Sequence, residues 1–190
     1  MSAKPARFNL NDNPQARPGV ISTLLRVDAW ASSIESDTPA FVPTPLPGSS
    51  TCDVIEQFAQ ALVSDATGIE RLLLLKSLQE AFFYSISLDT DLSADEIASR
   101  LKGFINRRGK AAFIEQFLSL YFFFYVWLDE SRRPQARTVE GFEHSIHIER
   151  ICRRAVIAAC AAEDVKDRLT AQTLIHNIQA ELQQLLDLAA

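Results

Sequence analysis

The spacing of hydrophobic residues along the chain predicts a helical protein. From residue 50 onward, apolar residues recur every three or four positions in long runs rich in Leu, Ala and Phe, as in amphipathic helices. No run shows the strict alternation of a half-buried strand, and no hairpin-turn sequence separates the runs. The pattern predicts six helices in this part of the chain, near residues 51–66, 69–88, 93–108, 110–130, 138–161 and 165–188.

Capping residues support three of these helix starts. In each of them, a Ser or Thr hydroxyl precedes a carboxylate by three positions, an arrangement that satisfies free backbone amides at a helix N-terminus. The three pairs are Ser50 with Asp53, Thr67 with Glu70, and Ser93 with Glu96. Two glycines, Gly68 and Gly109, stand where left-handed helix ends are expected.

Prolines set the first 49 residues apart. Seven of the eight prolines precede residue 48, and proline removes a backbone donor and restricts the residue before it. The apolar spacing within this part allows one short helix near 20–35, and the sequence FVPTPLP at 41–47 should lie extended across the bundle surface. We therefore expect an arm or linker over 1–49 and a helical domain over 50–190. The predicted fold is an all-α bundle of five to six helices with an extended, proline-containing N-terminal arm.

The most apolar segment, residues 111–128, is predicted to form the central helix of the bundle. Its 18 residues reach the lower limit for a membrane span. Glu115 lies within it, however, and a carboxylate is costly inside the hydrocarbon layer, so a buried helix is favoured over membrane contact. Packing of this helix against helix 69–88 is expected to give a Phe-rich core, filled by Phe82, Phe113, Phe117, Phe123 and Phe124.

The net charge of −5 argues against broad binding to nucleic acid or anionic membranes, which needs an excess of Lys and Arg. The sequence LSADEIASRL at 92–101 resembles the first helix of helix-turn-helix domains. In such domains, a short helix with a basic start follows and enters the major groove. The helix that follows here is Phe-rich instead, so neither nucleic acid nor a membrane is the expected partner.

Three cysteines, Cys52, Cys152 and Cys160, form no CxxC pair and leave an odd number for disulfides. This usage favours a reducing compartment. The polar residues before Pro18 lack the apolar core of a signal peptide. A cytoplasmic location is therefore expected.

Glu143, His144 and His147 are the nearest approach to a metal site, because residues three or four apart share a helix face. The di-iron pattern of helical bundles needs a Glu three residues before a His, and position 141 is a glycine. An exposed charged stripe that includes His147, with His144 partly buried, is the favoured interpretation. No cofactor is identified.

Signatures of catalysis are missing from the sequence, which has no Gly-rich phosphate loop, GxSxG elbow or HExxH motif. A role without catalysis is therefore favoured. A metal-dependent enzyme that uses the two histidines ranks third among the functions considered.

The last helix carries a short heptad seam, formed by Ala171, Ile175, Ile178, Leu182 and Leu185. Packing of this seam in the protein's own bundle is favoured over packing between molecules. Together with the surplus of apolar helix surface, the seam still favours a non-enzymatic interaction or regulatory protein that acts through helix packing. We expect such a protein to form a homodimer or to bind a helical partner.

The second functional hypothesis is a helical domain that holds an apolar small ligand or cofactor in its Phe-rich core. Sites of this kind use a few polar groups among apolar walls. Four aromatic residues with a polar edge could supply them: Tyr84, Tyr121, Tyr125 and Trp127.

Overall fold

The computed structural model describes residues 18–38, 40–43, 49–87, 92–130, 139–161 and 165–189, and these residues contain seven helices and no strand. The all-α class is therefore confirmed, but the helices number seven rather than five to six. They are α1 (Pro18–Glu35), α2 (Thr51–Leu62), α3 (Gly68–Ile86), α4 (Ala94–Arg108), α5 (Lys110–Glu130), α6 (Val139–Cys160) and α7 (Arg168–Ala189).

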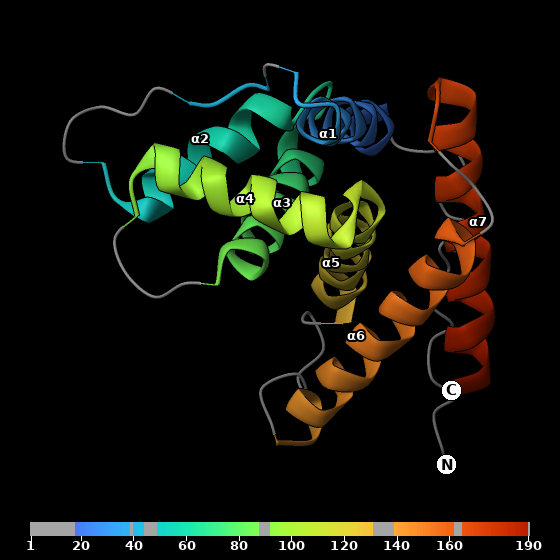
Figure 1. Cartoon of the computed structure of the whole chain (residues 1–190). Helices are drawn as coiled ribbons and strands as arrows, with labels where there is room; N and C mark the ends of the chain where they lie inside the picture. The colour runs from blue at the N-terminus through green and yellow to red at the C-terminus, as the bar shows by residue number, and fades with distance from the viewer. Residues whose placement is uncertain are drawn as a thin grey trace, which may run out of the picture.

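The centre of the bundle is α5. Figure 1 shows this helix nearly along its axis, with α1 to α4 on one side and α6 and α7 on the other. It contacts α1, α3, α4 and α6, while α6 pairs with α7. The last helix also packs against the first, because α7 contacts α1. The most apolar segment of the chain thus organises the fold, as its composition predicts.

The expected short helix of the N-terminal arm is instead a full element of the core. Its 18 residues run from Pro18 to Glu35, and Leu24, Val27 and Ala31 are wholly buried. The prolines flank this helix and do not interrupt it: Pro18 occupies the first helical position, where its missing N–H is tolerated. The bundle therefore includes α1. Residues 1–17, 39 and 44–48 of the expected arm lie outside the described residues.

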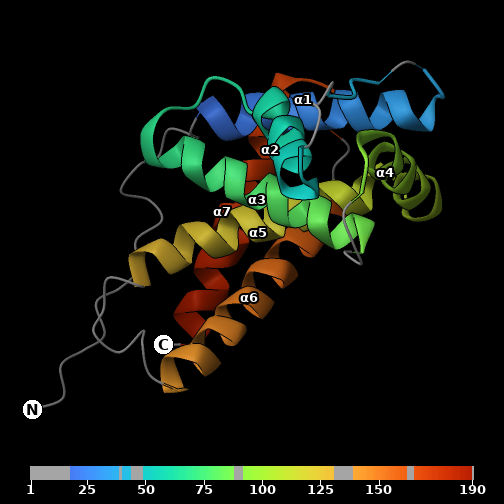
Figure 2. The ribbon, with the colours of Figure 1, turned by 90° about the vertical axis from the view of Figure 1, so that its left-hand side faces the viewer.

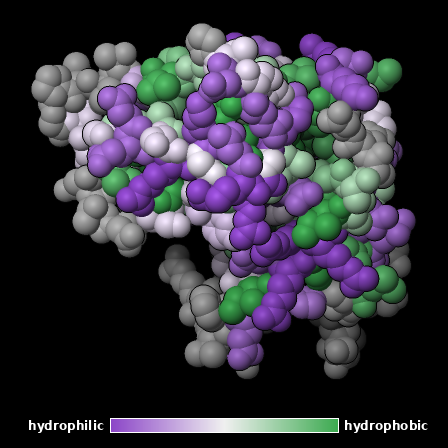
Figure 3. Space-filling model, viewed as in Figure 1, coloured by the Kyte–Doolittle hydropathy of each residue, from purple (hydrophilic) through white to green (hydrophobic). Residues whose placement is uncertain are grey.

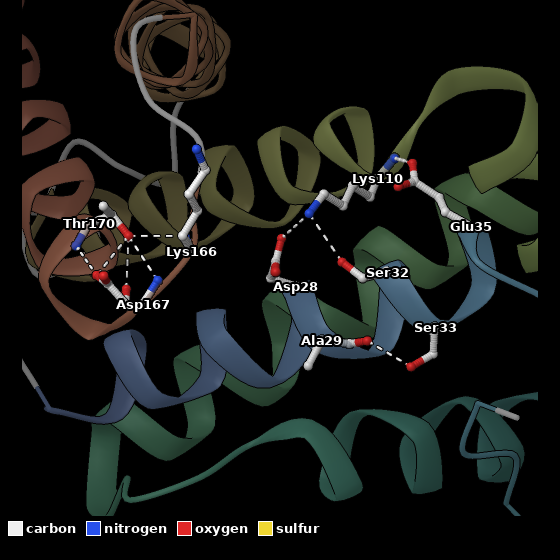
Figure 4. Close-up of polar contacts among 9 residues, drawn as sticks. All are labelled: Asp28, Ala29, Ser32, Ser33, Glu35, Lys110, Lys166, Asp167 and Thr170. Atoms are coloured by element: carbon white, nitrogen blue, oxygen red, sulfur yellow. Dashed lines mark hydrogen bonds and ion pairs between the residues drawn. The ribbon is translucent and has the colours of Figure 1, made fainter. Parts of the chain in front are cut away.

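Polar contacts fasten α1 to the start of α5 (Figure 4). The Lys110 ammonium lies 2.9 Å from an Asp28 carboxylate oxygen and donates to the Ser32 hydroxyl at 3.1 Å. The carboxylate of Glu35 accepts the backbone N–H of Lys110 at 2.7 Å. Because Lys110 is the first residue of α5, Glu35 satisfies one of the amides that have no partner within the helix.

Local capping also fixes the start of α7, beside the same region (Figure 4). The Asp167 carboxylate accepts the Thr170 backbone N–H at 2.8 Å, and the Thr170 hydroxyl accepts the Asp167 N–H at 3.0 Å. The backbone and hydroxyl donors of Thr170 hold the pKa of Asp167 below its ordinary value. This reciprocal cap explains why α7 begins at Arg168, three residues later than the periodicity predicts.

Two of the three predicted capping boxes are present. Ser50 and Asp53 form one at the start of α2, and Ser93 and Glu96 form the other at the start of α4. In each box, the serine backbone N–H donates to the carboxylate, at 2.8 Å for Asp53 and 2.9 Å for Glu96. These donors, with the serine hydroxyls, lower the pKa of both carboxyl groups.

The third pair behaves differently. Thr67 makes no side-chain cap bond, and Glu70 instead accepts the backbone N–H of Val20, at 3.2 Å, in the first turn of α1. The positive end of the α1 dipole thus attracts a carboxylate from α3 rather than from its own helix. The approach is close here because Gly19 has no side chain: a Cβ at this position would lie 2.8 Å from the Glu70 Cδ of α3 and 2.6 Å from the Cβ of Ala66, in the loop before α3.

Four aromatic rings from four helices form the centre of the core. Trp30 of α1 lies 5.6 Å from Phe82 of α3 and 5.5 Å from Phe113 of α5, measured between ring centroids. Phe58 of α2 completes the cluster, 5.6 Å from Phe82. These separations are typical of attractive aromatic pairs, which lie about 4.5–7 Å apart.

The predicted Phe-rich core is confirmed for Phe82, Phe113 and Phe117, which are fully buried. Phe123 and Phe124 are only half-buried, and Phe122 is buried in their place. Four helices, α1, α3, α4 and α6, contact α5. Their cover of Phe123 and Phe124 is partial, so both rings stay partly accessible. The part of α5 from Leu120 onward, which is apolar on all sides, is thus only partly covered by the described part of the chain.

Candidate interaction surface

The incomplete cover of α5 defines the first candidate site. In Figure 2, α5 runs between α3 and α6, and α3 crosses in front of its first half. Within the stretch Lys110–Leu128, 44% of the apolar window is buried, and most of the other residues are half-buried. Among the described helices, α5 alone is long and apolar enough to cross a membrane, although core helices of water-soluble proteins meet the same two criteria. The least covered side of α5 is therefore a candidate contact surface.

The least covered side carries Gln116, Ser119, Phe123 and Trp127, which we call the α5 face. At 100° per residue, Gln116, Phe123 and Trp127 fall within about 40° of one another on the helix. All four side chains are half-buried. The rings of Phe123 and Trp127 are stacked, with centroids 6.3 Å apart and an interplanar angle of 13°. The α5 face thus presents a preformed aromatic pair beside two small polar groups.

A groove of about 220 Å³ continues the α5 face toward the start of α5. We call it the α5 groove. Its walls come from α3, α4, α5 and α6, and they mix apolar with charged side chains, among them Tyr84, Arg108, Glu115, Arg153 and Ile157. Tyr84 and Ile157 are 60% and 45% exposed, more than expected of large side chains that belong to a finished core.

The charges in the α5 groove are unpaired within the described part of the chain. Glu115, Arg108 and Arg153 all line it, yet none of the three makes an ion pair there. Glu115 also acts on Cys160: burial and the Glu115 charge together raise the pKa of this thiol to about 12. The groove therefore holds one acid and two bases, each able to accept an outside partner of opposite charge.

The face that carries α4 and α6 differs from the α5 face. Figure 3 shows hydrophilic side chains over much of these two helices, with hydrophobic side chains as separate islands. The two most exposed leucines, Leu169 (72%) and Leu188 (84%), lie at opposite ends of α7. Single exposed leucines are ordinary on protein surfaces. In the described part of the face that Figure 3 shows, hydrophobic side chains are thus scattered among hydrophilic ones.

The predicted seam of α7 faces the protein's own interior. Four of its residues are buried and the last is half-buried: Ala171, Ile175, Ile178, Leu182 and Leu185. Helices α6 and α1 occupy the positions that a partner helix would take. This is the packing that the sequence favours. Use of the seam between molecules stays a prediction, and it requires α7 to leave its place in the bundle.

The four aromatic residues predicted to contact a ligand are not brought together. Tyr84 is exposed on α3 and lines the α5 groove, and Trp127 belongs to the α5 face. Tyr121 is buried on the other side of α5, where Tyr125 stacks on it with ring centroids 6.4 Å apart. A single ligand cannot contact all four side chains in this arrangement.

The metal hypothesis gains no support from the arrangement of side chains. Glu143, His144 and His147 are all exposed on α6. His144, expected to be partly buried, is exposed because the buried side of α6 begins at Ile148 in the described part of this helix. Within the residues that the structure describes, no group of three or more His, Cys, Asp or Glu side chains could hold a metal ion.

A second hollow, of about 300 Å³, lies between α1, α2 and α4. We call it the Trp30 pocket. Its inner wall is formed by Trp30, Ile34, Phe58 and Ala98. Residues 40–42 form its outer wall, where the Trp30 indole N–H donates to the Phe41 carbonyl at 3.3 Å. The pocket thus lies against the edge of the aromatic core, whose Trp30 and Phe58 side chains are 6% and 1% exposed.

Polar groups stand at the mouth of the Trp30 pocket, namely Asp37, Thr38, Ser99 and Lys102. The Lys102 ammonium forms an ion pair with the Asp37 carboxylate, and the hydrogen bond and charge of Lys102 lower the pKa of Asp37. Reasoning from the sequence missed this pocket. Its only signal was Phe41, an apolar ring in a proline-containing segment that was expected to lie across the bundle surface.

Comparison with known proteins gives no relative for this chain: no family model matches it, and no curated protein or solved structure resembles it significantly.

Proposed function

We propose that this chain is a non-enzymatic interaction protein that forms a homodimer through the α5 face. The observation that carries the proposal is the incomplete cover of the most apolar helix, in which 44% of the apolar window is buried. Burial of apolar surface contributes about 25 cal/mol per Å². A second copy that covers Phe123 and Trp127 therefore supplies the burial that the single bundle lacks.

The aromatic pair suits the centre of an interface. Large aromatic side chains provide most of the binding free energy at many protein interfaces, and tryptophan is prominent among them. Phe123 and Trp127 already stack on each other in the single chain. Little side-chain entropy is then lost on association, so more of the burial energy appears as affinity.

The charges of the α5 groove favour a second copy over an unrelated partner. In a two-fold dimer, the same surface of both copies meets. Every contact therefore occurs twice: if one residue of the first copy touches a second residue of the other copy, the reverse pair also touches. Such an axis beside the α5 face would bring Glu115 of one copy toward Arg108 or Arg153 of the other. A surface that carries both signs of charge around an apolar centre is self-complementary in this sense.

The proposed role requires no chemistry beyond packing. The protein would act in the cytoplasm as a helical dimer or as the helical partner of another protein. Three free cysteines, one of them exposed at Cys52, are compatible with a reducing compartment. Nucleic acid and membranes are not proposed as partners, given the net charge of −5.

The test is sedimentation velocity across a dilution series of the full chain. We expect a dimer at high micromolar concentration that dissociates on dilution. Gln116→Lys places two ammonium groups near the two-fold axis and should weaken the dimer at least tenfold, or about 1.4 kcal/mol. The matched control is Gln172→Lys, on the exposed side of α7, which should leave the dimer unchanged.

A charge-exchange experiment tests the pairing itself. Glu115→Arg and Arg153→Glu should each weaken the dimer, and the double variant should restore it in part. A monomer at every concentration would refute self-association. A monomeric chain that sediments with neutral vesicles would assign the α5 face to a membrane surface instead, and a dimer insensitive to Gln116→Lys would move the interface elsewhere.

A further inference from the structure

The walls of the Trp30 pocket have the character of a small-molecule site. Its volume of about 300 Å³ lies at the lower end of the range for ligand pockets, roughly 300–1,000 Å³. Trp30 and Phe58 form its floor, with ring centroids 6.3 Å apart and steeply inclined to each other. A flat aromatic molecule can pack against one ring with its face and against the other with its edge.

Contacts with Trp30 and Phe58 also hold the outer wall of the pocket, residues 40–42, in place. The Phe41 ring lies edge-on to Phe58, with 6.3 Å between their centroids, and the Phe41 carbonyl accepts the Trp30 indole N–H. Phe41 is nevertheless 50% exposed. A ligand that filled the pocket would cover the inner side of this ring and bury an apolar surface that now faces solvent.

The mouth of the pocket is suited to an anionic group. Among the described residues that line it, Lys102 is the only cation, and Thr38 and Ser99 add hydroxyl donors. Lys102 pairs with Asp37, whose side chain is 81% exposed. An ion pair this exposed is weak, so a carboxylate that enters the pocket can replace Asp37 at the ammonium group.

We propose that the Trp30 pocket binds a small aromatic carboxylate, with the ring against Trp30 and Phe58 and the carboxylate at Lys102. This site goes beyond the proposed self-association. It lies among α1, α2 and α4, whereas the α5 face lies between α3 and α6, so each site can be tested without disturbing the other.

The probes are naphthalene-2-carboxylate and its neutral counterpart, naphthalene-2-carboxamide, which share one shape and differ in charge. Binding is followed by ¹H–¹⁵N NMR of the full chain at the indole N–H groups. The protein has two tryptophans, Trp30 and Trp127, and Trp127→Phe assigns the two signals. We expect the Trp30 signal to move on titration, because its N–H forms the bond to Phe41 at the pocket wall.

The charge of Lys102 should decide between the probes. The carboxylate should bind about fivefold more tightly than the amide, and this preference should shrink as salt is added. Lys102→Gln should remove the preference. The matched control is Lys76→Gln, which also breaks an exposed ion pair, with Glu80 on α3, and should leave the preference intact.

Filling the pocket with a larger side chain tests whether the probes bind there. Ala98→Leu directs extra methyl groups into the empty volume, so the fold should be kept while both probes lose affinity. Three results would overturn the proposal: no movement of the Trp30 signal with either probe, equal affinity for both probes in the wild type, or unchanged binding to Ala98→Leu. Movement of the Trp127 signal alone would place the probe on the α5 face and would equally overturn it.

Discussion

Replacing Leu24 with alanine should lower the free energy of unfolding by about 3 kcal/mol, in the range found for buried leucines. Leu24 is fully buried in α1, so the change removes apolar contacts and leaves a cavity between α1 and its neighbours. For a chain of this size, each kcal/mol lowers the melting temperature by roughly 2–4 °C, so a loss of roughly 6–12 °C is expected.

The assay is urea unfolding followed by circular dichroism, at a concentration low enough to keep the protein monomeric. Leu72→Ala is the matched control, because Leu72 is 66% exposed on α3 and the same atoms are removed. The control should change the unfolding free energy by less than about 0.5 kcal/mol. If Leu24→Ala cost no more than the control, α1 would be a loosely attached arm and its place in the core would be wrong.

Two further results are expected. A double-mutant cycle with Asp28→Asn and Lys110→Met should give a coupling of about 1–2 kcal/mol by urea unfolding, because the side chains of this pair are only 16% and 25% exposed; a coupling near zero would contradict their pairing. Of the three thiols, only Cys52 should react with iodoacetamide at pH 8 in the folded protein, as counted by mass spectrometry. Burial raises the pKa of the others to about 12, so their thiolates become available only as the pH approaches that value. Rapid labelling below it would refute the burial of Cys152 and the partial burial of Cys160.

The sequence predicts the helices best where local signals agree. Helix α5 begins and ends at the predicted residues, 110 and 130, with Gly109 directly before it at a positive φ of 80°. Helix α2 is less well predicted and ends at Leu62, four residues early. Hydrophobic spacing continues beyond this point, but Val63 adopts an extended conformation and its side chain is still buried. Periodicity alone cannot distinguish a helix from a loop that packs on the core.

The place of α1 shows a different limit. Prolines exclude a helix only where they fall inside it, and none lies between Pro18 and Glu35. The contacts that bind α1 to the bundle, such as those of Asp28 and Glu35 with Lys110, join residues far apart in the sequence. No local sequence pattern predicts such contacts. A segment with the composition of a linker can therefore still form part of a core.

The candidate sites were the least predictable features. Phe122, Phe123 and Phe124 are consecutive and identical in type, so their sequence gives no sign that only the first is buried. The positions of α3 and α6 around α5 decide the outcome. The Trp30 pocket depends on three helices that meet, and only Phe41 at its outer wall gave a signal in the sequence.

The four-helix aromatic cluster has a consequence for how the protein folds. Asp28 and Lys110 lie 82 residues apart, and the rings of Trp30 and Phe113 meet across a similar separation. Contacts of such long range form slowly, because a large loop must close before they gain any energy. Of the described helices, α1 is made before the others, and its partners in the core, α2, α3, α4, α5 and α7, all follow it along the chain. The apolar side of α1 is therefore fully covered only after α7 has been made, and until then it is a surface that a chaperone can protect.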